Sequence, residues 1–360
     1  MEPLVSVIIP TYQRAELLRK AMCSVWAQTY RHWELIVVEN GRSQVGREIV
    51  QEFQRSDARL RYLYRREPGG LLARNMGIQE ARGEYIAFLD NDDEWLATKL
   101  ERQVSWLVSH ERDGLVVCQA LCVDGEGRVL DVVPHAGRRP TLRALVTNEC
   151  GLFSLSGAVV RRGCFDRVGV FSTRYPIAND YDLYFRLAKA GYGIGLVEEP
   201  LFRYRLHSGN LTSDRSWMWR DLASVLRSLE PEPSQGVTHR EIQEAIVRNA
   251  RWCYTEAIES VDRRQYGRAA RYYRAAVQCD PWIGAKVAWS RSSSKIYRVL
   301  RPYLAFGYCF MRSLARWGRS SSVEATAVCE VMKYSQLNRL SADQADVIER
   351  RDEAGVEKRT

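Results

Sequence analysis

Short apolar runs alternate with amphipathic stretches along the first part of the chain. A short continuous apolar run is typical of a strand that is buried on both faces, as in a parallel sheet. The stretches between the runs place Leu, Val, Ile and Met at helical spacing. The predicted strands and the helices between them are, in chain order, 5–9, 15–28, 35–38, 44–53, 60–64, 71–80 and 85–89. This alternation predicts an α/β fold with a mostly parallel sheet flanked by helices.

The pattern becomes less regular after Trp95. Pro10 is expected to end the first strand, because proline has no N–H to donate to a central ladder. The later elements predicted before residue 215 are a helix at 98–109, hairpin strands at 115–123 and 128–133, a strand at 155–160, a helix at 182–190 and a strand at 192–197.

Acidic residues follow the apolar run 85–89 directly. Asp90, Asp92, Asp93 and Glu94 lie within five positions, with no turn residue before them. A buried strand cannot hold carboxylates in its middle, so we expect them at its carboxyl end, where open α/β sheets bind ligands. Clustered carboxylates favour Mg²⁺ or Mn²⁺, and such an ion can hold a diphosphate. The alternative is an acidic turn that is simply solvated.

Composition and missing motifs exclude several classes of protein. Hydrophobic residues make up 46% of the 360 residues and charged residues 27%, as in ordinary soluble proteins. Neither GxGxxG nor a P-loop motif follows a predicted strand, which disfavours nicotinamide enzymes and P-loop ATPases. The nine cysteines form no CxxC pair, and we see no signal peptide and no apolar run of membrane-spanning length. We therefore expect a cytoplasmic protein with reduced thiols.

Positive charge is concentrated near the end of the chain. Residues 282–319 hold eight Lys or Arg and no acidic residue, which accounts for most of the net charge of +9. The rest is nearly neutral, so we expect no nucleic-acid partner. Because this segment also carries apolar and aromatic residues at helical spacing, it could make a peripheral membrane contact. Alternatively, its apolar stripe packs on the protein itself.

Four sequence segments together resemble the family 2 inverting glycosyltransferases. They occur in the order and at about the spacing that is usual in that family, and the resemblance covers about residues 1–215. It implies a nucleotide-sugar-binding α/β fold of the A type. The four segments are Val5–Arg14, Ala73–Gly77, Gly83–Trp95 and Asn179–Asp182.

The resemblance implies a set of donor-binding residues. Thr11 and Tyr12 would border the base, and Glu39 would accept a hydrogen bond from uracil or ribose. Arg74 would reach a phosphate or the nucleoside. Asp90 would contact the ribose or a metal ion.

The resemblance also implies a metal site and a base. Asp92 would bind Mn²⁺ or Mg²⁺, together with His207, and Arg205 would face the phosphate. Asp180 is the candidate general base, although Asn179 replaces the glutamate that commonly precedes it in the family. Inversion by single displacement needs one such carboxylate to take the proton of the acceptor hydroxyl.

Each of these residues also has a purely structural alternative. Glu39 and Arg74 are of types that usually lie exposed on the surface. Asp180 precedes an amphipathic stretch and could cap its helix. A lone histidine such as His207 is more often structural than metal-binding.

The implied function is a metal-dependent, inverting transfer of a sugar from a nucleotide-diphosphate donor, a UDP-sugar. The acceptor would be a glycan, a lipid-linked sugar or a cell-surface polymer. One alternative is a sugar-nucleotide nucleotidyltransferase, although Pro10–Arg14 lacks the glycines of its phosphate loop. Another is a non-catalytic scaffold with a degenerate transferase domain, since Asn40 and Asn179 depart from the family pattern.

The chain is expected to have three parts. Residues 1–215 form the catalytic domain. Residues 216–319 form a C-terminal α-helical region with one tetratricopeptide-like hairpin around 257–281, followed by the basic segment. Residues 320–360 form a polar tail that is partly disordered.

Overall fold

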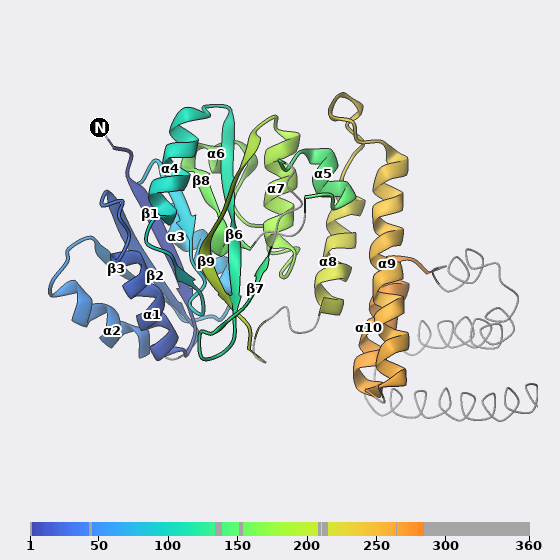
Figure 1. Cartoon of the computed structure of the whole chain (residues 1–360), viewed down its shortest axis with the longest axis horizontal. Helices are drawn as coiled ribbons and strands as arrows, with labels where there is room; N and C mark the ends of the chain where they lie inside the picture. The colour runs from blue at the N-terminus through green and yellow to red at the C-terminus, as the bar shows by residue number, and fades with distance from the viewer. Residues whose placement is uncertain are drawn as a thin grey trace, which may run out of the picture. The chain divides into compact units, whose positions relative to one another are not determined.

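The computed structural model has two compact units, Met1–Ile246 and a second that begins at Val247 (Figure 1). It describes residues 2–42, 45–133, 139–150, 154–207, 210, 215–263, 265–281 and 283. The basic segment 282–319, except residue 283, and the tail 320–360 lie outside the described residues. The three-part division at 215 and 319 stays a prediction.

The first part of the chain forms the parallel half of the sheet. Its strands lie in the order β3-β2-β1-β4, and each neighbouring pair is parallel. Strands β1, β2 and β4 are buried throughout, which explains their mostly apolar sequences, whereas β3 at the edge is only partly buried. The elements are β1 (Val5–Thr11), α1 (Ala15–Trp26), β2 (Trp33–Asn40), α2 (Val45–Gln54), β3 (Leu60–Arg65), α3 (Gly70–Glu80) and β4 (Tyr85–Phe88).

The expected end of the first strand at Pro10 is wrong by one residue, since β1 continues to Thr11. Ile8 is the last β1 residue in register with β4, and its carbonyl accepts from the Leu89 N–H at 3.1 Å. The backbone nitrogen of Pro10 is on the same side of β1 as the backbone groups of Ile8, the side of β4, because residues two apart in a strand have the same orientation. At Pro10 that neighbour has already ended, so the missing N–H costs no ladder hydrogen bond.

The remainder of the first unit completes a mixed sheet. Among the described residues the full order is β3-β2-β1-β4-β8-β6-β9-β5, with β7 paired to β6. The α/β fold with flanking helices is confirmed, while the later strands pair both parallel and antiparallel. The elements are β5 (Glu94–Trp95), α4 (Lys99–Ser109), β6 (Asp113–Val123), β7 (Val129–Val133), α5 (Leu142–Thr147), η1 (Leu155–Gly157), β8 (Val159–Arg161), α6 (Arg162–Val168), α7 (Asn179–Lys189), β9 (Gly193–Arg205), α8 (Arg215–Ser228) and η3 (Pro233–Gln235).

Two predicted strands differ from the observed ones. The run 155–160 begins as the 3-10 turn η1, because the Ser154 hydroxyl accepts from the Ser156 N–H at 3.3 Å and starts a turn there. Only β8 follows it as a strand. The expected strand 192–197 continues to Arg205, because β9 pairs with β6 along its whole length, through three irregularities of register.

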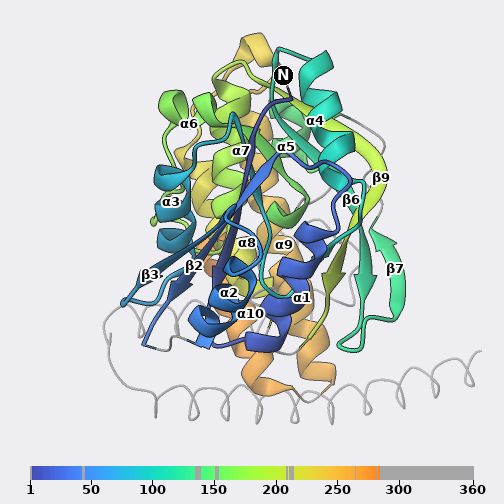
Figure 2. The ribbon, with the colours of Figure 1, turned by 90° about the vertical axis from the view of Figure 1, so that its left-hand side faces the viewer.

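Helices cover both faces of the sheet (Figure 2). On one face, apolar residues of α1, α2 and α4 join the odd-numbered residues of β1 in one core cluster. On the other face, Gly77 of α3 lies so close to Ile8 that an added Cβ would be 2.6 Å from its side chain. The ring of Phe165 from α6 meets that of Phe88 on the same face, with centroids 6.4 Å apart.

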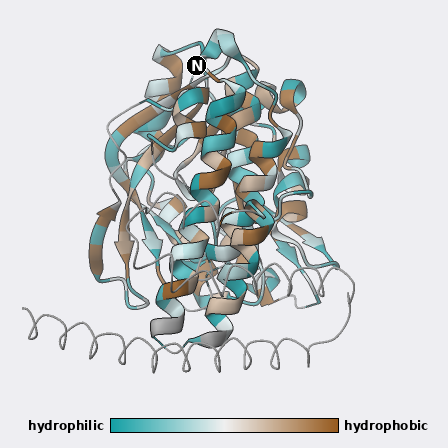
Figure 3. Ribbon diagram, turned by 90° about the vertical axis from the view of Figure 1, so that its right-hand side faces the viewer, coloured by the Kyte–Doolittle hydropathy of each residue, from teal (hydrophilic) through white to brown (hydrophobic). Residues whose placement is uncertain are grey.

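The second unit contains the end of α9 (His239–Asp262) and α10 (Tyr266–Cys279). Tyr254 and Tyr273 bring their rings to 6.3 Å, and Arg268 pairs with Glu256 at 3.4 Å. Both helices carry brown and teal turns in Figure 3, as expected for helices with one apolar side. Among the described residues, no helix is long and apolar enough to cross a bilayer. The likeness of this region to a tetratricopeptide hairpin stays a prediction.

Candidate active site

The sheet places the candidate residues at the carboxyl ends of its parallel strands. The strand order reverses between β1 and β4, and open α/β sheets bind ligands at such a point. Thr11 ends β1 in register with Glu39 of β2. The Asn91 amide, just after β4, donates to the Thr11 hydroxyl oxygen at 2.9 Å. Three strand ends that are far apart in sequence therefore meet at one edge.

Asn40 connects this edge to the start of α3. Its Nδ2 donates to the Thr11 carbonyl at 2.9 Å, and its Oδ1 accepts from the Gly69 N–H at 2.9 Å. An amide can do both, because it has a donor and an acceptor, whereas an aspartate could only accept. The departure from the family pattern at this position therefore has a structural role.

Tyr12 and Glu39 lie very differently at this edge. Tyr12 is 47% exposed, and its ring lies against Gly41, where an added Cβ would be 2.5 Å from the ring. Glu39 is only 1% exposed, and its two oxygens accept from the Gly46 N–H at 3.1 Å and the Tyr62 hydroxyl at 2.8 Å. Burial and the bond to Glu39 raise the pKa of Tyr62. Glu39 thus holds the start of α2 against the sheet.

Asp92 lies between two partners from distant parts of the chain. Its Oδ2 is contacted by the Nη1 of Arg14, which precedes α1. The Nε2 of His207, which follows β9, lies 3.1 Å from the same oxygen and 3.4 Å from the Arg14 nitrogen. The backbone N–H of His207 donates to the side-chain oxygen of Asn210 at 2.6 Å.

Asp92 and His207 are chemically suited to a divalent cation. No group of three or more His, Cys, Asp or Glu side chains that could hold a metal occurs among the described residues. However, Mg²⁺ is often held by one or two protein ligands together with substrate phosphates and water. Adjacent ligands of an octahedral ion with bonds of about 2.1 Å are about 3 Å apart. The 3.1 Å between Asp92 Oδ2 and His207 Nε2 matches this separation.

Arg205 does not face this space, which corrects the expectation that it would meet a phosphate. It is 3% exposed. Its guanidinium donates to the backbone carbonyls of Asp92, Asp124 and Gly125, and it pairs with Glu94. Arg205 therefore fixes the acidic turn to the β6–β7 hairpin.

Asp93 is buried below the same turn. The carboxyl of Asp93 accepts a hydrogen bond from the backbone N–H of Arg205 at 3.0 Å. Burial raises the pKa of Asp93 well above its usual value, and the carboxylates of Asp90 and Asp92 add to this. Asp93 thus supports the turn from the inside.

Arg74 and Asp90 form an ion pair at the carboxyl end of β4. Arg74, on α3, donates from Nη2 to Asp90 Oδ1, while its Nε is buried without a hydrogen-bond partner among the described residues. The Asp90 N–H donates to the Ser156 hydroxyl at 3.1 Å. The side chain of Asp90 remains 32% exposed.

Asp180 joins this pair from the first turn of α7. Burial raises the pKa of Asp180 to about 7, the Asp90 carboxylate acts in the same direction, and the Tyr181 N–H and the Arg74 guanidinium oppose it. Its Oδ1 accepts from the Tyr181 N–H at 2.9 Å. The structure therefore brings together Asp180, Arg74 and Asp90, whose charges act on one another.

Tyr184 belongs to the same group, although the sequence analysis did not select it. It lies one helical turn after Asp180, is 1% exposed, and has a hydroxyl with no partner among the described residues. Burial raises the pKa of Tyr184 well above its usual value, with Asp180 contributing next. Its spacing of four residues from Asp180 was the one signal in the sequence.

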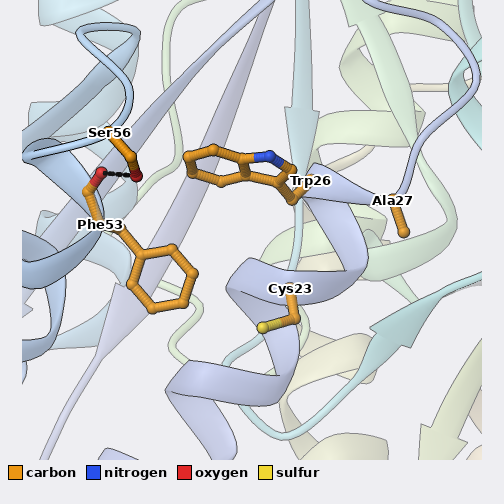
Figure 4. Close-up of a pocket in the computed structure, with 5 residues that line it drawn as sticks. All are labelled: Cys23, Trp26, Ala27, Phe53 and Ser56. Carbon is orange, nitrogen blue, oxygen red and sulfur yellow. Dashed lines mark hydrogen bonds between the residues drawn. The ribbon is translucent and has the colours of Figure 1, made fainter.

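An open hollow of about 420 Å³ lies elsewhere (Figure 4). Helix α1 runs from the carboxyl end of β1 back to the amino end of β2, so the end of α1 lies at the other edge of the sheet from Asp90. The hollow has no charged residue in its lining, and we assign it no part in the chemistry. It is lined by Cys23, Trp26, Ala27, Phe53 and Ser56.

Comparisons with known proteins identify the family and the fold. Residues 6–169 match the family model "Glycosyl transferase family 2". The chain is 27% identical over 256 residues to the putative teichuronic acid biosynthesis glycosyltransferase TuaG of Bacillus subtilis, covering 71% of this chain and 94% of TuaG. It is 41% identical over 108 residues to WfgD of Escherichia coli, a "UDP-Glc:alpha-D-GlcNAc-diphosphoundecaprenol beta-1,3-glucosyltransferase", covering 30% of this chain and 42% of WfgD.

Solved structures share the fold. TarS 1–349 of S. aureus in complex with UDP-GlcNAc aligns with a TM-score of 0.58 at 15% identity, over 88% of this chain and 93% of that one. The mannosyltransferase PcManGT of Pyrobaculum calidifontis, in complex with GDP-Man and Mn²⁺, aligns with a TM-score of 0.57 at 19% identity. The alignment covers 93% of this chain and 87% of that one. A longer TarS structure is covered over 52% of its length. Residues 6–169 of this chain are a family 2 glycosyltransferase domain, and the chain has the A-type fold that these solved structures share.

Proposed function

We propose that this glycosyltransferase transfers a sugar from a UDP-sugar, with inversion and with a divalent cation, to a glycan or lipid-linked acceptor in polysaccharide assembly. The observation that carries the proposal is that the carboxylate of Asp180, in the first turn of α7, interacts electrostatically with Arg74 and with Asp90, which lies two residues before Asp92 at the end of β4. The names of TuaG and WfgD, and the UDP-GlcNAc bound to TarS, support the donor and the acceptor class.

The donor is assigned to residues at the strand ends. Tyr12, which is exposed, and Thr11, which is buried, would border the base. Arg74 and Asp90, which form an ion pair at the end of β4, would meet the ribose and the phosphates. A nucleoside contact by Glu39 stays a prediction, since its carboxylate is buried and holds α2.

Asp92 and His207 are the proposed ligands of Mn²⁺ or Mg²⁺. Their 3.1 Å separation and the exposure of both side chains support this assignment. When bound, the cation would stabilise the negative charge that develops on the departing diphosphate.

Asp180 is the proposed general base. Its carboxylate would take the proton from the acceptor hydroxyl as that oxygen bonds to the anomeric carbon. The bond from that carbon to the diphosphate breaks, and the nucleoside diphosphate leaves with the electron pair. A carboxylate with a pKa near 7 is well suited to this task near neutral pH.

We propose a cytoplasmic protein that works at a membrane surface, since a lipid-linked acceptor would be anchored there. The basic segment 282–319 is the proposed contact.

The test is a transfer assay with the full chain. UDP-glucose, UDP-GlcNAc and UDP-galactose are offered with Mn²⁺ and with a sugar linked to diphosphoundecaprenol. We expect transfer from one of them, with a β linkage formed from the α-linked donor and read by NMR. Absence of both transfer and UDP binding would instead favour a non-catalytic scaffold.

The turnover number is expected to depend on the protonation of Asp180. Its pKa of about 7 means that kcat should rise about tenfold per pH unit below 7 and level off above it, because only the carboxylate accepts the proton. Arg74, Asp90, Tyr181 and Tyr184 are the charged or titratable groups that act on it. Measuring kcat at saturating donor between about pH 5.5 and 8.5 checks this. A kcat that stays constant across this range would show that the base does not titrate near pH 7.

Asp92→Ala is expected to remove the metal dependence of nucleotide binding. Loss of groups that support a metal site costs about 10–100-fold in metal affinity, and loss of a direct ligand should cost at least as much. UDP affinity, measured by calorimetry with Mn²⁺, should fall to the level found with EDTA. Glu52→Ala is the matched control, since Glu52 is an exposed acid that pairs with Arg19 on the surface. An unchanged response to Mn²⁺ in Asp92→Ala would place the metal elsewhere.

A further inference from the structure

Arg14 lies against both residues of the Asp92–His207 site, and the proposed function gives it no role. Its Nη1 contacts Asp92 Oδ2 and lies 3.4 Å from His207 Nε2, while those two atoms are 3.1 Å apart. The side chains of Arg14, Asp92 and His207 are 33%, 15% and 23% exposed. A guanidinium therefore lies against both proposed metal ligands, at a place that solvent can reach.

These three contacts cannot all be favourable hydrogen bonds. Arginine only donates and a carboxylate only accepts, whereas a neutral imidazole nitrogen does one or the other. If His207 Nε2 carries a proton, it can donate to Asp92, but it then points one donor toward the donor of Arg14. If Nε2 carries a lone pair, it can accept from Arg14, but it then faces the lone pairs of Asp92. Either tautomer leaves one contact unfavourable.

A divalent cation in place of the Arg14 guanidinium removes this unfavourable contact. With the lone pair on Nε2, both His207 and Asp92 present lone pairs toward one point, and a divalent ion accepts from both. A guanidinium brings one charge, while Mn²⁺ or Mg²⁺ brings two. The ion pair that must be broken is partly exposed, so it holds Arg14 in place only weakly.

We propose that Arg14 is a resident cation at the Asp92–His207 pair, that it competes with the divalent ion for these ligands, and that its released guanidinium then binds the donor diphosphate. The inference rests on the proposed metal site. Arg14 lies in the connection between β1 and α1, at the edge where β1 ends. An arginine there can reach a phosphate through a charge-assisted pair.

The test measures Mn²⁺ binding to the full-length protein without nucleotide, through the electron paramagnetic resonance signal of free Mn²⁺. Arg14→Met is the variant, because methionine keeps most of the bulk and offers no hard ligand. We expect Mn²⁺ to bind about fivefold more tightly to Arg14→Met than to wild type, the upper range for an exposed ion pair. The control Arg19→Met removes the same charge from a surface pair on α1 and should change the affinity less than about twofold.

A second measurement addresses the released guanidinium. With saturating Mn²⁺, UDP should bind Arg14→Met about tenfold or more weakly, because a hydrogen bond to a charged group is lost. Circular dichroism and the melting temperature report whether each variant is folded. Opposite changes in the two affinities are not expected from a residue that only supports the fold.

The outcomes separate the inference from the function on which it rests. If Asp92→Ala loses Mn²⁺ binding while Arg14→Met binds Mn²⁺ like wild type or more weakly, Arg14 does not compete and the inference is overturned. If wild type and Asp92→Ala bind Mn²⁺ equally, the metal site itself is wrong. Tighter Mn²⁺ binding together with weaker UDP binding in Arg14→Met supports both parts of the inference.

Discussion

Replacing Asp180 with asparagine is expected to lower kcat by about 10²–10⁴-fold, the usual contribution of a general base. Asparagine has nearly the shape of aspartate and keeps an oxygen for the Tyr181 N–H, which bonds to Asp180 at 2.9 Å. Its amide, however, cannot take a proton from the acceptor hydroxyl. UDP affinity should stay within about twofold of wild type, because the donor is assigned to other side chains. Single-turnover rates and calorimetry with UDP measure the two effects separately.

The stability of the same variant provides an independent check. The pKa of Asp180 in the folded protein is about 7, above its value of 3.8 in the unfolded chain. The folded state therefore binds more protons than the unfolded state between these pH values, and this contribution to stability is lost as pH rises through the window. Above pH 7 the partly buried carboxylate is charged, and its desolvation costs stability. Asp180→Asn removes that cost, so at pH 8 it should be at least as stable as wild type.

Asp182→Asn is the matched control for Asp180→Asn. Asp182 lies in the same first turn of α7, but its carboxylate pairs with Arg186 at 2.8 and 3.0 Å. We expect this variant to lose stability and to keep most of its kcat. If Asp180→Asn transfers sugar at the rate of wild type, or if both variants lose activity in proportion to stability, the assignment of the base is wrong.

The positions of the strand-end residues followed from the sequence because a simple physical rule fixes them. A carboxylate in the middle of a strand buried on both faces is costly, so Glu39 and the acids from Asp90 to Glu94 were expected near strand ends. Parallel strands that alternate with helices place those ends at one edge. The position of Asp180 came only from the resemblance to the glycosyltransferases, since nothing in the local pattern shows that α7 begins beside Asp90.

Side-chain partners were not predictable in the same way. The sequence locates Glu39 at a strand end, but only the packing of α2 shows that Gly46 and Tyr62 cover its carboxylate. Arg205 lies two positions before His207 in a motif, and residues two apart in a strand point to the same side. However, β9 ends at Arg205, so the side chain of His207 need not follow that rule. Arg14 reaches Asp92 across 78 positions, a contact that no local pattern contains.

Arg205→Met is expected to lower the free energy of unfolding by about 3–5 kcal/mol, the usual cost of breaking a buried ion pair by removing one partner. Methionine fills most of the space of the arginine but has no donor. The Glu94 carboxylate loses its buried partner, and the carbonyls of Asp92, Asp124 and Gly125 lose theirs. Urea unfolding of the full chain, followed by tryptophan fluorescence, measures the change.

Arg203→Met separates burial from charge, because both arginines lie on β9 and pair with the same glutamate. Arg203 is 43% exposed and 3.6 Å from Glu94, whereas the Arg205 side chain is 4% exposed. A surface pair contributes at most about 1 kcal/mol, so Arg203→Met should stay within that range. If the two variants lose equal stability, the network around Arg205 does not hold the acidic turn. If only Arg205→Met is destabilised, the buried side chain of Arg205 holds the turn that contains Asp92. The affinity of Arg205→Met for Mn²⁺ should then also be lower than that of wild type.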